Sequence, residues 1–307
     1  MPKLTDSPGR AGHGMRNLYR VGFLLEKRMK LEKSQTSTII FGFDSAWTDS
    51  PKAPGAICAV GFDRLGQVEF QEPRLVSFIK ALEFIEEKRR DYAVSLVSID
   101  QPTVVPNATG SRPVDKVAAS LISFIGGGVQ PANRSKVGMF CDDAPIWTFL
   151  SRLNATDDPL EARTASAGHF VIEVFPALAL PALEPAFARR LGAPKYNPKN
   201  RRKFRLEDWQ MVSRVVRETA RQLGVSGLVE WAEEMRALAH PCKADQDKVD
   251  ASICALVGLL WRAGARNDSV MLGDRGSGFM ISPLSDYVKP RLESAAQRRD
   301  VLFSAPP

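Results

Sequence analysis

Two apolar segments of the chain each end on an aspartate, with a helix pattern between them. TIIFGFD (38–44) and AVSLVSID (93–100) have the β-branched and aromatic content of buried strands. Between them, RLVSFIKALEFIEEKRR (74–90) repeats apolar residues at helical spacing. A strand, a helix and a second strand in this order form a crossover unit, in which the strands run parallel. The sequence therefore predicts a sheet whose central strands end on Asp44 and Asp100.

Further strand patterns predict that this sheet is mixed. GAICAVGFD (55–63) and QVEFQEP (67–73) are separated by a short turn across 63–66, as in a hairpin, and HFVIEVFP (169–176) has the pattern of another buried strand. We expect an α/β domain with a mixed five-stranded sheet and helices on both faces. Helices are predicted near 114–125, 144–153, 203–223, 227–238 and 247–263, and a strand pair at 269–273 and 278–283.

The domain is expected to cover residues 38–290. Residues 1–37 form an N-terminal extension, flexible or helical and rich in Arg and Lys, and residues 291–307 a C-terminal tail. No apolar run approaches the roughly 18–20 residues that span a bilayer, so no membrane partner is expected. The four cysteines form no CxxC pair, and the start of the chain lacks a signal-peptide pattern, so a cytoplasmic location is expected.

Acidic residues occur where a metal site could assemble. Asp44 and Asp100 end neighbouring strands, and the carboxyl ends of such strands meet at the edge where α/β sheets bind ligands. Asp247 and Asp250, three residues apart, share a helix face in DQDKVDASICALVGLLW. Glu173 interrupts an apolar strand and must find a partner or an ion there. We expect Asp44, Asp100 and Asp250 to bind Mg²⁺ or Mn²⁺, ions that prefer oxygen ligands, with Asp247 and Glu173 as further catalytic acids.

Each of these acids also has a structural interpretation. Asp44, or Asp100 before Gln-Pro, could begin a turn. Asp245 and Asp247 could cap the helix, because acids favour its first turn. The combination, more than any single residue, favours a site.

Six segments in this order resemble one known family: GFDSAW, SIDQP, SRPVD, EVFPA, KYNPKNRRKFR and DKVDASICAL. They are similar to the predicted ribonuclease H-like nucleases of domain-of-unknown-function family 429, over roughly residues 38–290. That family is similar to ribonuclease H and to the Holliday-junction resolvases. The resemblance implies a ribonuclease H-like fold, with Asp44, Asp100 and Asp250 as metal ligands. It also singles out Arg112, as a substrate phosphate contact or as one half of a buried ion pair with Asp115.

A basic cluster just before a predicted helix suggests a polyanionic partner, in a chain of net charge +7. Its residues suited to bind phosphates without reading sequence are Lys199, Arg201, Arg202 and Lys203, with Lys195 and Arg205 flanking them. A solvated loop is the alternative. Tyr196, Phe204 and Trp209 could stack on bases or pack on the helix.

Together these features predict a metal-dependent nuclease that hydrolyses phosphodiester bonds in DNA or RNA. A non-catalytic nucleic-acid-binding protein on the same scaffold is the alternative. A kinase-like ATPase is disfavoured, since SAWTDSPKAP (45–54) lacks a glycine-bearing phosphate loop. The related resolvases also suggest a homodimer.

Overall fold

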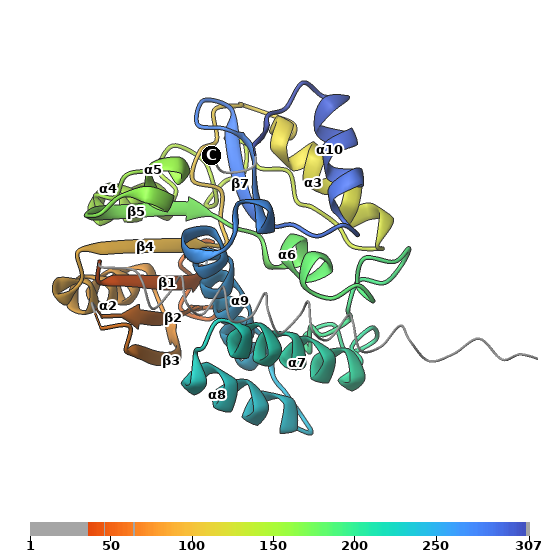
Figure 1. Cartoon of the computed structure of the whole chain (residues 1–307). Helices are drawn as coiled ribbons and strands as arrows, with labels where there is room; N and C mark the ends of the chain where they lie inside the picture. The colour runs from red at the N-terminus through yellow and green to blue at the C-terminus, as the bar shows by residue number, and fades with distance from the viewer. Residues whose placement is uncertain (1–35, 46, 64, 305–307) are drawn as a thin grey trace, which may run out of the picture.

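The central element is a mixed five-stranded sheet in the order β3-β2-β1-β4-β5. The computed structural model describes residues 36–45, 47–63 and 65–304, and Figure 1 shows the strands stacked in this order. The strands are β1 (Thr38–Asp44), β2 (Gly55–Phe62), β3 (Val68–Val76), β4 (Val94–Ile99) and β5 (Gly168–Glu173). β1 pairs antiparallel with β2 and parallel with β4. β2 pairs antiparallel with β3, and β4 pairs parallel with β5. The predicted mixed α/β sheet is confirmed, and its topology is consistent with the ribonuclease H-like fold.

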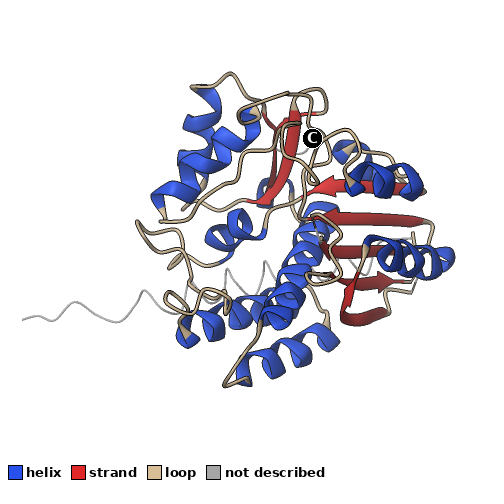
Figure 2. Ribbon diagram, turned by 180° about the vertical axis from the view of Figure 1, so that it is seen from behind, coloured by secondary structure: helices blue, strands red, loops and turns tan. Residues whose placement is uncertain are grey.

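Helices cover both faces of this sheet, as Figures 1 and 2 show from opposite sides. The helices of the described residues, some of which pack on a second sheet, are α2 (Phe78–Lys88), α3 (Pro113–Phe124), α4 (Pro145–Leu153), α5 (Pro159–Thr164), α6 (Pro176–Leu183), α7 (Leu206–Gln222), α8 (Ser226–Ala237), α9 (Lys243–Ala263) and α10 (Lys289–Gln297). Short 3-10 turns follow α2 at Arg89–Asp91 and α9 at Arg266–Asp268. None of the helices in the described part of the chain is both long and apolar enough to cross a membrane.

The alternation of side chains along β1 separates the two faces. Ile39, Phe41 and Phe43 point to one side, where they pack with residues of α2 and α4 such as Phe78 and Phe149. Ile40 belongs to the core on the other side, which α7, α8 and α9 share. Because successive strand residues alternate, Gly42 and Asp44 lie on the same side as Ile40. The face that receives Asp44 is therefore the face that α9 covers.

Small residues let α9 approach the sheet closely. A Cβ at Gly42 would lie 2.0 Å from the carbonyl oxygen of Ala251 and 2.4 Å from the amide nitrogen of Ala255. One helical turn along, a Cβ at Gly258 would lie 2.2 Å from Oγ of Ser98 in β4. No side chain other than hydrogen fits at either glycine while the helix keeps this distance. The contact fixes the position of Asp250, which directly precedes Ala251.

A second, smaller sheet has the order β7-β6-β8 and packs with α3, α6 and α10. Its strands are β6 (Ser269–Asp274), β7 (Gly278–Pro283) and β8 (Phe303–Ser304), and β6 and β7 form the predicted antiparallel pair. Most of the expected tail, 291–307, is described, and residues 291–304 pack on this unit. Leu292, Ala295 and Ala296 of α10 are buried in its core, and Phe303 pairs with Leu272 of β6. The predicted N-terminal extension, 1–37, lies outside the described residues except for its last two.

The structure corrects several helix boundaries. α2 begins at Phe78 instead of 74, because residues 74–76 continue β3 alongside β2 and the Ser77 side chain caps the helix. α9 begins four residues before the predicted 247. The sequence analysis missed α6, where a strand was expected to run through Pro176. β5 ends at Glu173, and Pro176 begins the helix at its first position.

Candidate functional site

Asp44 and Asp100 lie side by side at the carboxyl ends of the two central parallel strands. Phe43 of β1 is paired with Ile99 of β4, and the amide of Asp100 donates a hydrogen bond of 2.8 Å to the carbonyl of Phe43. Along β4, Ser98 faces α9, so the alternation carries Asp100 to the same side as Asp44. The predicted meeting of these two carboxylates at the sheet edge is therefore supported by the strand register.

Asp250 reaches this edge from the helix. Its Oδ1 accepts a hydrogen bond of 2.7 Å from the hydroxyl of Tyr196, and its Oδ2 accepts one of 2.8 Å from Nε2 of Gln246. Gln246 lies one helical turn before Asp250, while Tyr196 comes from the loop before α7. Two partners from different elements thus fix the orientation of the carboxylate.

The three carboxyl groups act on one another electrostatically. Burial raises the pKa of Asp44 well above its usual value, and Asp250 and Asp100 raise it further. Burial also raises the pKa of Asp100 well above normal, and the charge of Asp250 is the second cause of this shift. For Asp250, burial raises the pKa to about 6, although Lys243, Tyr196 and Gln246 act in the opposite direction. These three aspartates, from β1, β4 and α9, are called the aspartate cluster below.

The charge of Lys243 acts on all three aspartates of this cluster. Lys243 forms an ion pair with Asp247 one turn along α9, and its charge lowers the pKa of Asp44, Asp100 and Asp250. Asp247 is therefore close to the cluster but engaged with a lysine. Asp245 accepts a hydrogen bond of 2.8 Å from the amide of Cys242, which is the capping role weighed for it.

The donor chemistry of the cluster fits a hard divalent cation. Within the described ranges, no group of three His, Cys, Asp or Glu side chains stands ready as a metal site. However, the carboxylates of Asp44 and Asp100 accept no hydrogen bond from any described residue, although Asp44 is only 9% exposed. Carboxylates held together in low dielectric without donors favour a bound cation, and oxygen ligands suit Mg²⁺ or Mn²⁺. Asp44, Asp100 and Asp250 are the residues that would hold it.

Glu173 does not join the aspartate cluster but pairs with Arg112. The guanidinium donates to both carboxylate oxygens of Glu173 at 2.6 and 2.7 Å. It also donates to Oδ1 of Asp115 at 2.8 and 3.1 Å, and to the carbonyl of Val104 at 3.0 Å. Although burial acts against its charge, these two carboxylates raise the pKa of Arg112.

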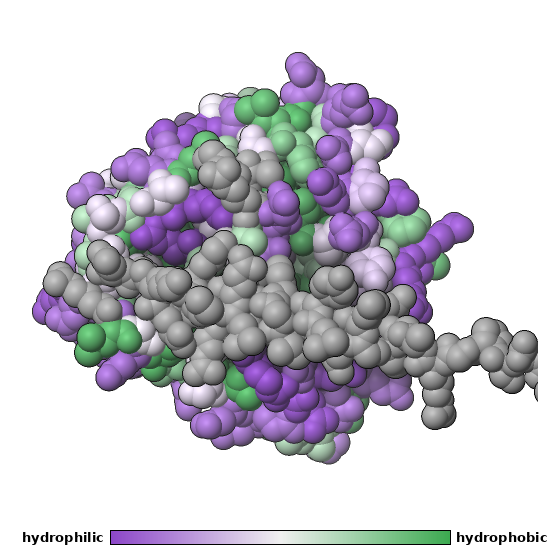
Figure 3. Space-filling view, viewed as in Figure 1, coloured by the Kyte–Doolittle hydropathy of each residue, from purple (hydrophilic) through white to green (hydrophobic). Residues whose placement is uncertain are grey.

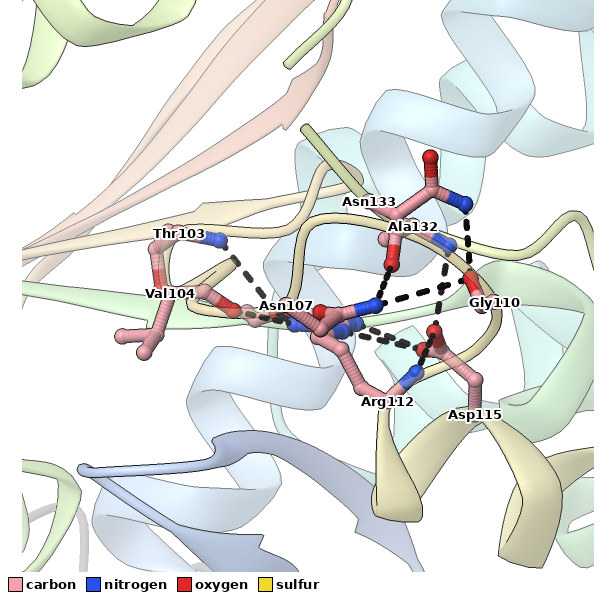
Figure 4. A network of polar contacts seen from close by, with 9 residues as sticks. Thr103, Val104, Asn107, Gly110, Arg112, Asp115, Ala132 and Asn133 are labelled. Atoms are coloured by element: carbon pink, nitrogen blue, oxygen red, sulfur yellow. Dashed lines mark hydrogen bonds and ion pairs between the residues drawn. The ribbon is translucent and has the colours of Figure 1, made fainter. Parts of the chain in front are cut away.

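This network accounts for every N–H of the Arg112 guanidinium, whose side chain is fully buried. Figure 4 shows how Asp115 also accepts from the amide of Ala132, while Asn107 and Asn133 tie the surrounding loops together. Of the two roles considered for Arg112, the buried ion pair is the one observed, and no donor is left for a substrate phosphate. Glu173 is correspondingly a partner of arginine and not a free acid.

Strand alternation explains why Glu173 is separated from the cluster. In β5, Val171 packs in the core on the α2 and α4 side, and Glu173 lies two residues further along. Its side chain therefore leaves the strand on the face opposite to α9. The sequence pattern correctly placed an acid at the carboxyl end of this strand. It did not predict to which face of the sheet the side chain points.

The predicted basic cluster lies in an exposed loop that closes on itself. The amide of Arg205 donates 2.8 Å to the carbonyl of Lys195, and the amide of Lys195 donates 2.7 Å to Asp208 at the start of α7. Four exposed basic residues of this loop, called the basic loop below, are Lys199, Arg201, Arg202 and Lys203. None of these four has an ion pair with a described residue. Tyr196, in the same loop, connects it to Asp250.

Three arginines of α7 and α8, by contrast, are paired. The face of α7 and α8 is largely hydrophilic (Figure 3), and its arginines contact glutamates on the same two helices. These ion pairs join Arg217 to Glu218 and Glu233, Arg221 to Glu218, and Arg236 to Glu233. The four residues of the basic loop differ from these arginines, since no described carboxylate pairs with them.

Three residues of the site were not assigned a role there by sequence reasoning: Gln246, Lys243 and Tyr196. The first two lie four residues before Asp250 and Asp247, a helical spacing that brings side chains together and could have revealed them. Tyr196 was considered for base stacking. Its contact with Asp250 joins residues 54 positions apart, and no local pattern indicates such a contact.

The fold and the cluster define an α/β protein with an acidic site at the carboxyl ends of its central strands. A comparison with protein families matches residues 42–273 to the family described as "Protein of unknown function (DUF429)". The match covers most of the chain, and the protein belongs to this family. Neither the comparison with curated proteins nor the comparison with solved structures gave a match.

Proposed function

We propose that the protein is a divalent-metal-dependent hydrolase that cleaves phosphodiester bonds in nucleic acid. The observation that carries this proposal is the aspartate cluster: Asp44, Asp100 and Asp250 come from three elements, and the charge of Asp250 raises the pKa of the other two beyond the effect of burial. Such an arrangement destabilises the free protein, because like charges share a low-dielectric site. A bound cation would neutralise the clustered negative charges, and this benefit would explain why the protein keeps such an arrangement.

The residues around the cluster have separate tasks. Asp44, Asp100 and Asp250 would hold Mg²⁺ or Mn²⁺, while Tyr196 and Gln246 keep Asp250 in one orientation. When bound, the metal supplies activation of water and stabilisation of the leaving oxygen. The basic loop binds the phosphate backbone of the substrate, which gives affinity without sequence preference.

A second candidate function is nucleic-acid binding without catalysis. It is favoured by Lys243, whose charge lies among the acids and partly replaces a metal ion. In that case the aspartates and the lysine form a structural network, and only the basic loop contacts nucleic acid. Cytoplasmic location and a homodimer remain predictions under both functions.

Cleavage assays with two variants separate these functions. We expect Asp44→Asn and Asp250→Asn each to lower Mn²⁺-dependent cleavage of labelled DNA and RNA by about 10³-fold, since a lost ligand removes several kcal/mol of transition-state stabilisation. Asp286→Asn, at an exposed carboxylate in the loop after β7, is the matched control and should cleave normally. Folding is checked by circular dichroism. Full activity in both cluster variants, or no metal-dependent cleavage by the unmodified protein, contradicts the hydrolase.

A further inference from the structure

A small pocket opens beside Asp100 and is not explained by the metal site. Its volume is about 120 Å³. Apolar atoms provide most of its lining, and Trp47, Asp100 and Gly128 are among its residues. Pockets for drug-sized ligands are about 300–1,000 Å³, so this one has room for a single ring system only.

The three ionic residues that line the pocket offer it no free hydrogen-bond donors, so its polar side chain with a free donor is the exposed amide of Gln130. Arg112, Asp115 and Glu173 all contribute to its lining, but the guanidinium has used every N–H on the two carboxylates and Val104. A charged ligand would find no partner among these three. The pocket therefore suits a flat, largely apolar group that stacks on aromatic side chains.

Trp47 is held at this pocket in a backbone conformation that tryptophan seldom adopts. Its φ is 47°, in the left-handed region that is unfavourable for bulky residues. The fully buried Gln101 donates 3.3 Å to its carbonyl, and Oγ of Ser45 accepts 3.4 Å from its amide. Its ring packs edge-on against Phe140, with centroids 5.7 Å apart. The surrounding residues thus stabilise a strained loop that keeps an indole beside Asp100.

We propose that this pocket binds one nucleobase of a single-stranded nucleic acid, stacked on Trp47. This inference rests on the proposed function and specifies its substrate, since Asp100 belongs to both the pocket and the aspartate cluster. A base inside a duplex is paired and stacked and cannot enter, whereas a base in a single strand or a displaced nucleotide can. The substrate is accordingly an unpaired strand or an unpaired segment within a duplex.

Binding without metal tests the pocket separately from catalysis. Fluorescence anisotropy in EDTA would follow short single-stranded DNA and RNA, the matching duplexes, and a strand of the same length whose sites are all abasic. Trp47→Ala should weaken binding of both single strands about tenfold, because stacking contributes about 1–3 kcal/mol per base. The abasic strand should bind Trp47→Ala and the unmodified protein equally. Tyr287→Ala, at an exposed aromatic residue outside the pocket, is the matched control.

A second variant guards against a merely structural effect at Trp47. Gly128 lines the pocket, and a Cβ there would meet no atom within 4 Å, so Gly128→Leu should fold normally while narrowing the cavity. It too should weaken single-strand binding and leave abasic binding unchanged. The pocket assignment is overturned if both variants bind single strands normally, if the loss is equal on the abasic strand, or if the unmodified protein binds duplexes as tightly as single strands.

The two proposals fail in different assays. If Trp47→Ala binds single strands normally and Asp44→Asn is inactive in Mn²⁺, the base-pocket proposal is wrong and the hydrolase proposal stands. Normal cleavage by both aspartate variants, with the stacking effect intact, would leave a single-strand-binding protein. The affinities for single-stranded RNA and single-stranded DNA, measured by fluorescence anisotropy, show which of the two the pocket prefers.

Discussion

Two groups of buried acids lie at the same edge of the sheet, and they are treated in opposite ways. Glu173 and Asp115 share one arginine, and short hydrogen bonds satisfy its guanidinium and both carboxylates. Asp44 and Asp100 accept no hydrogen bond from the described residues, and burial together with neighbouring acids raises the pKa of each. The first group is a completed structural network. The second is a pair of acids that has no hydrogen-bond donor among the described residues.

This difference separates acids that the described residues compensate from acids that they leave uncompensated. Burial alone does not decide, because all four carboxylates are largely removed from water. The presence of compensating groups does decide. A buried acid that has a cation and hydrogen-bond donors stabilises a specific conformation. Clustered acids without such partners lower stability until a ligand binds. The variants below remove a charge or a hydrogen-bond donor from one of the two groups. They are given in order of decreasing expected effect.

Removing the arginine should damage the protein most. Arg112→Met leaves Glu173 and Asp115 buried without their cation, and we expect a loss of about 3–5 kcal/mol in the free energy of unfolding. Urea denaturation measures it. Arg214→Met is the matched control, because its 3.5 Å ion pair with Glu184 is half exposed and should contribute about 0–1 kcal/mol. An equal, small effect for both arginines would contradict a structural role for the network.

In the absence of metal, the free energy of unfolding should decrease as the pH rises. Addition of Mn²⁺ should restore it. The folded-state pKa of Asp250 is about 6, against 3.8 for an ordinary aspartate, so the folded protein binds more protons than the unfolded chain between these values. The free energy of unfolding contributed by this residue therefore decreases as pH rises from about 4 through about 6. The raised pKa values of Asp44 and Asp100 change stability in the same direction. Thermal unfolding between pH 5 and pH 8 measures the trend.

A divalent cation binds the deprotonated acids, so its effect should have the opposite pH dependence. At 100 times its dissociation constant, Mn²⁺ should stabilise the protein by about 2.7 kcal/mol at pH 8 and by clearly less at pH 5. Asp44→Asn should be more stable than the unmodified protein without metal at pH 8 and should respond less to Mn²⁺. Stabilisation by Mn²⁺ that is equal in this variant would place the bound metal elsewhere.

Loss of the tyrosine hydroxyl should have the smallest effect. Tyr196→Phe removes a hydrogen bond that lowers the pKa of Asp250, so a proton should compete more effectively with the metal. We expect about tenfold weaker Mn²⁺ binding, measured by calorimetry, and a binding curve displaced to higher pH. Tyr287→Phe, on the exposed surface, should change neither quantity. Unchanged Mn²⁺ binding in Tyr196→Phe would limit Tyr196 to packing.

The sequence by itself determined the sheet and the acids that end its central strands. Alternation in TIIFGFD places Gly42 and Asp44 on one face, and the crossover pattern puts Asp100 on the neighbouring strand. These are local signals, since strand periodicity and strand order follow from residues close together in the chain. The helix spacing likewise brings Asp247 and Asp250 to one side of α9.

Only the tertiary structure decided which acids act together. Glu173 had the same strand-end pattern as the others, but a long-range contact with Arg112 gave it a cation. Asp250 joined Asp44 and Asp100 because Gly42 allows α9 to lie directly on β1, and Tyr196 then reached it from a distant loop. Charge compensation depends on distances between residues remote in sequence, and no local pattern encodes those distances.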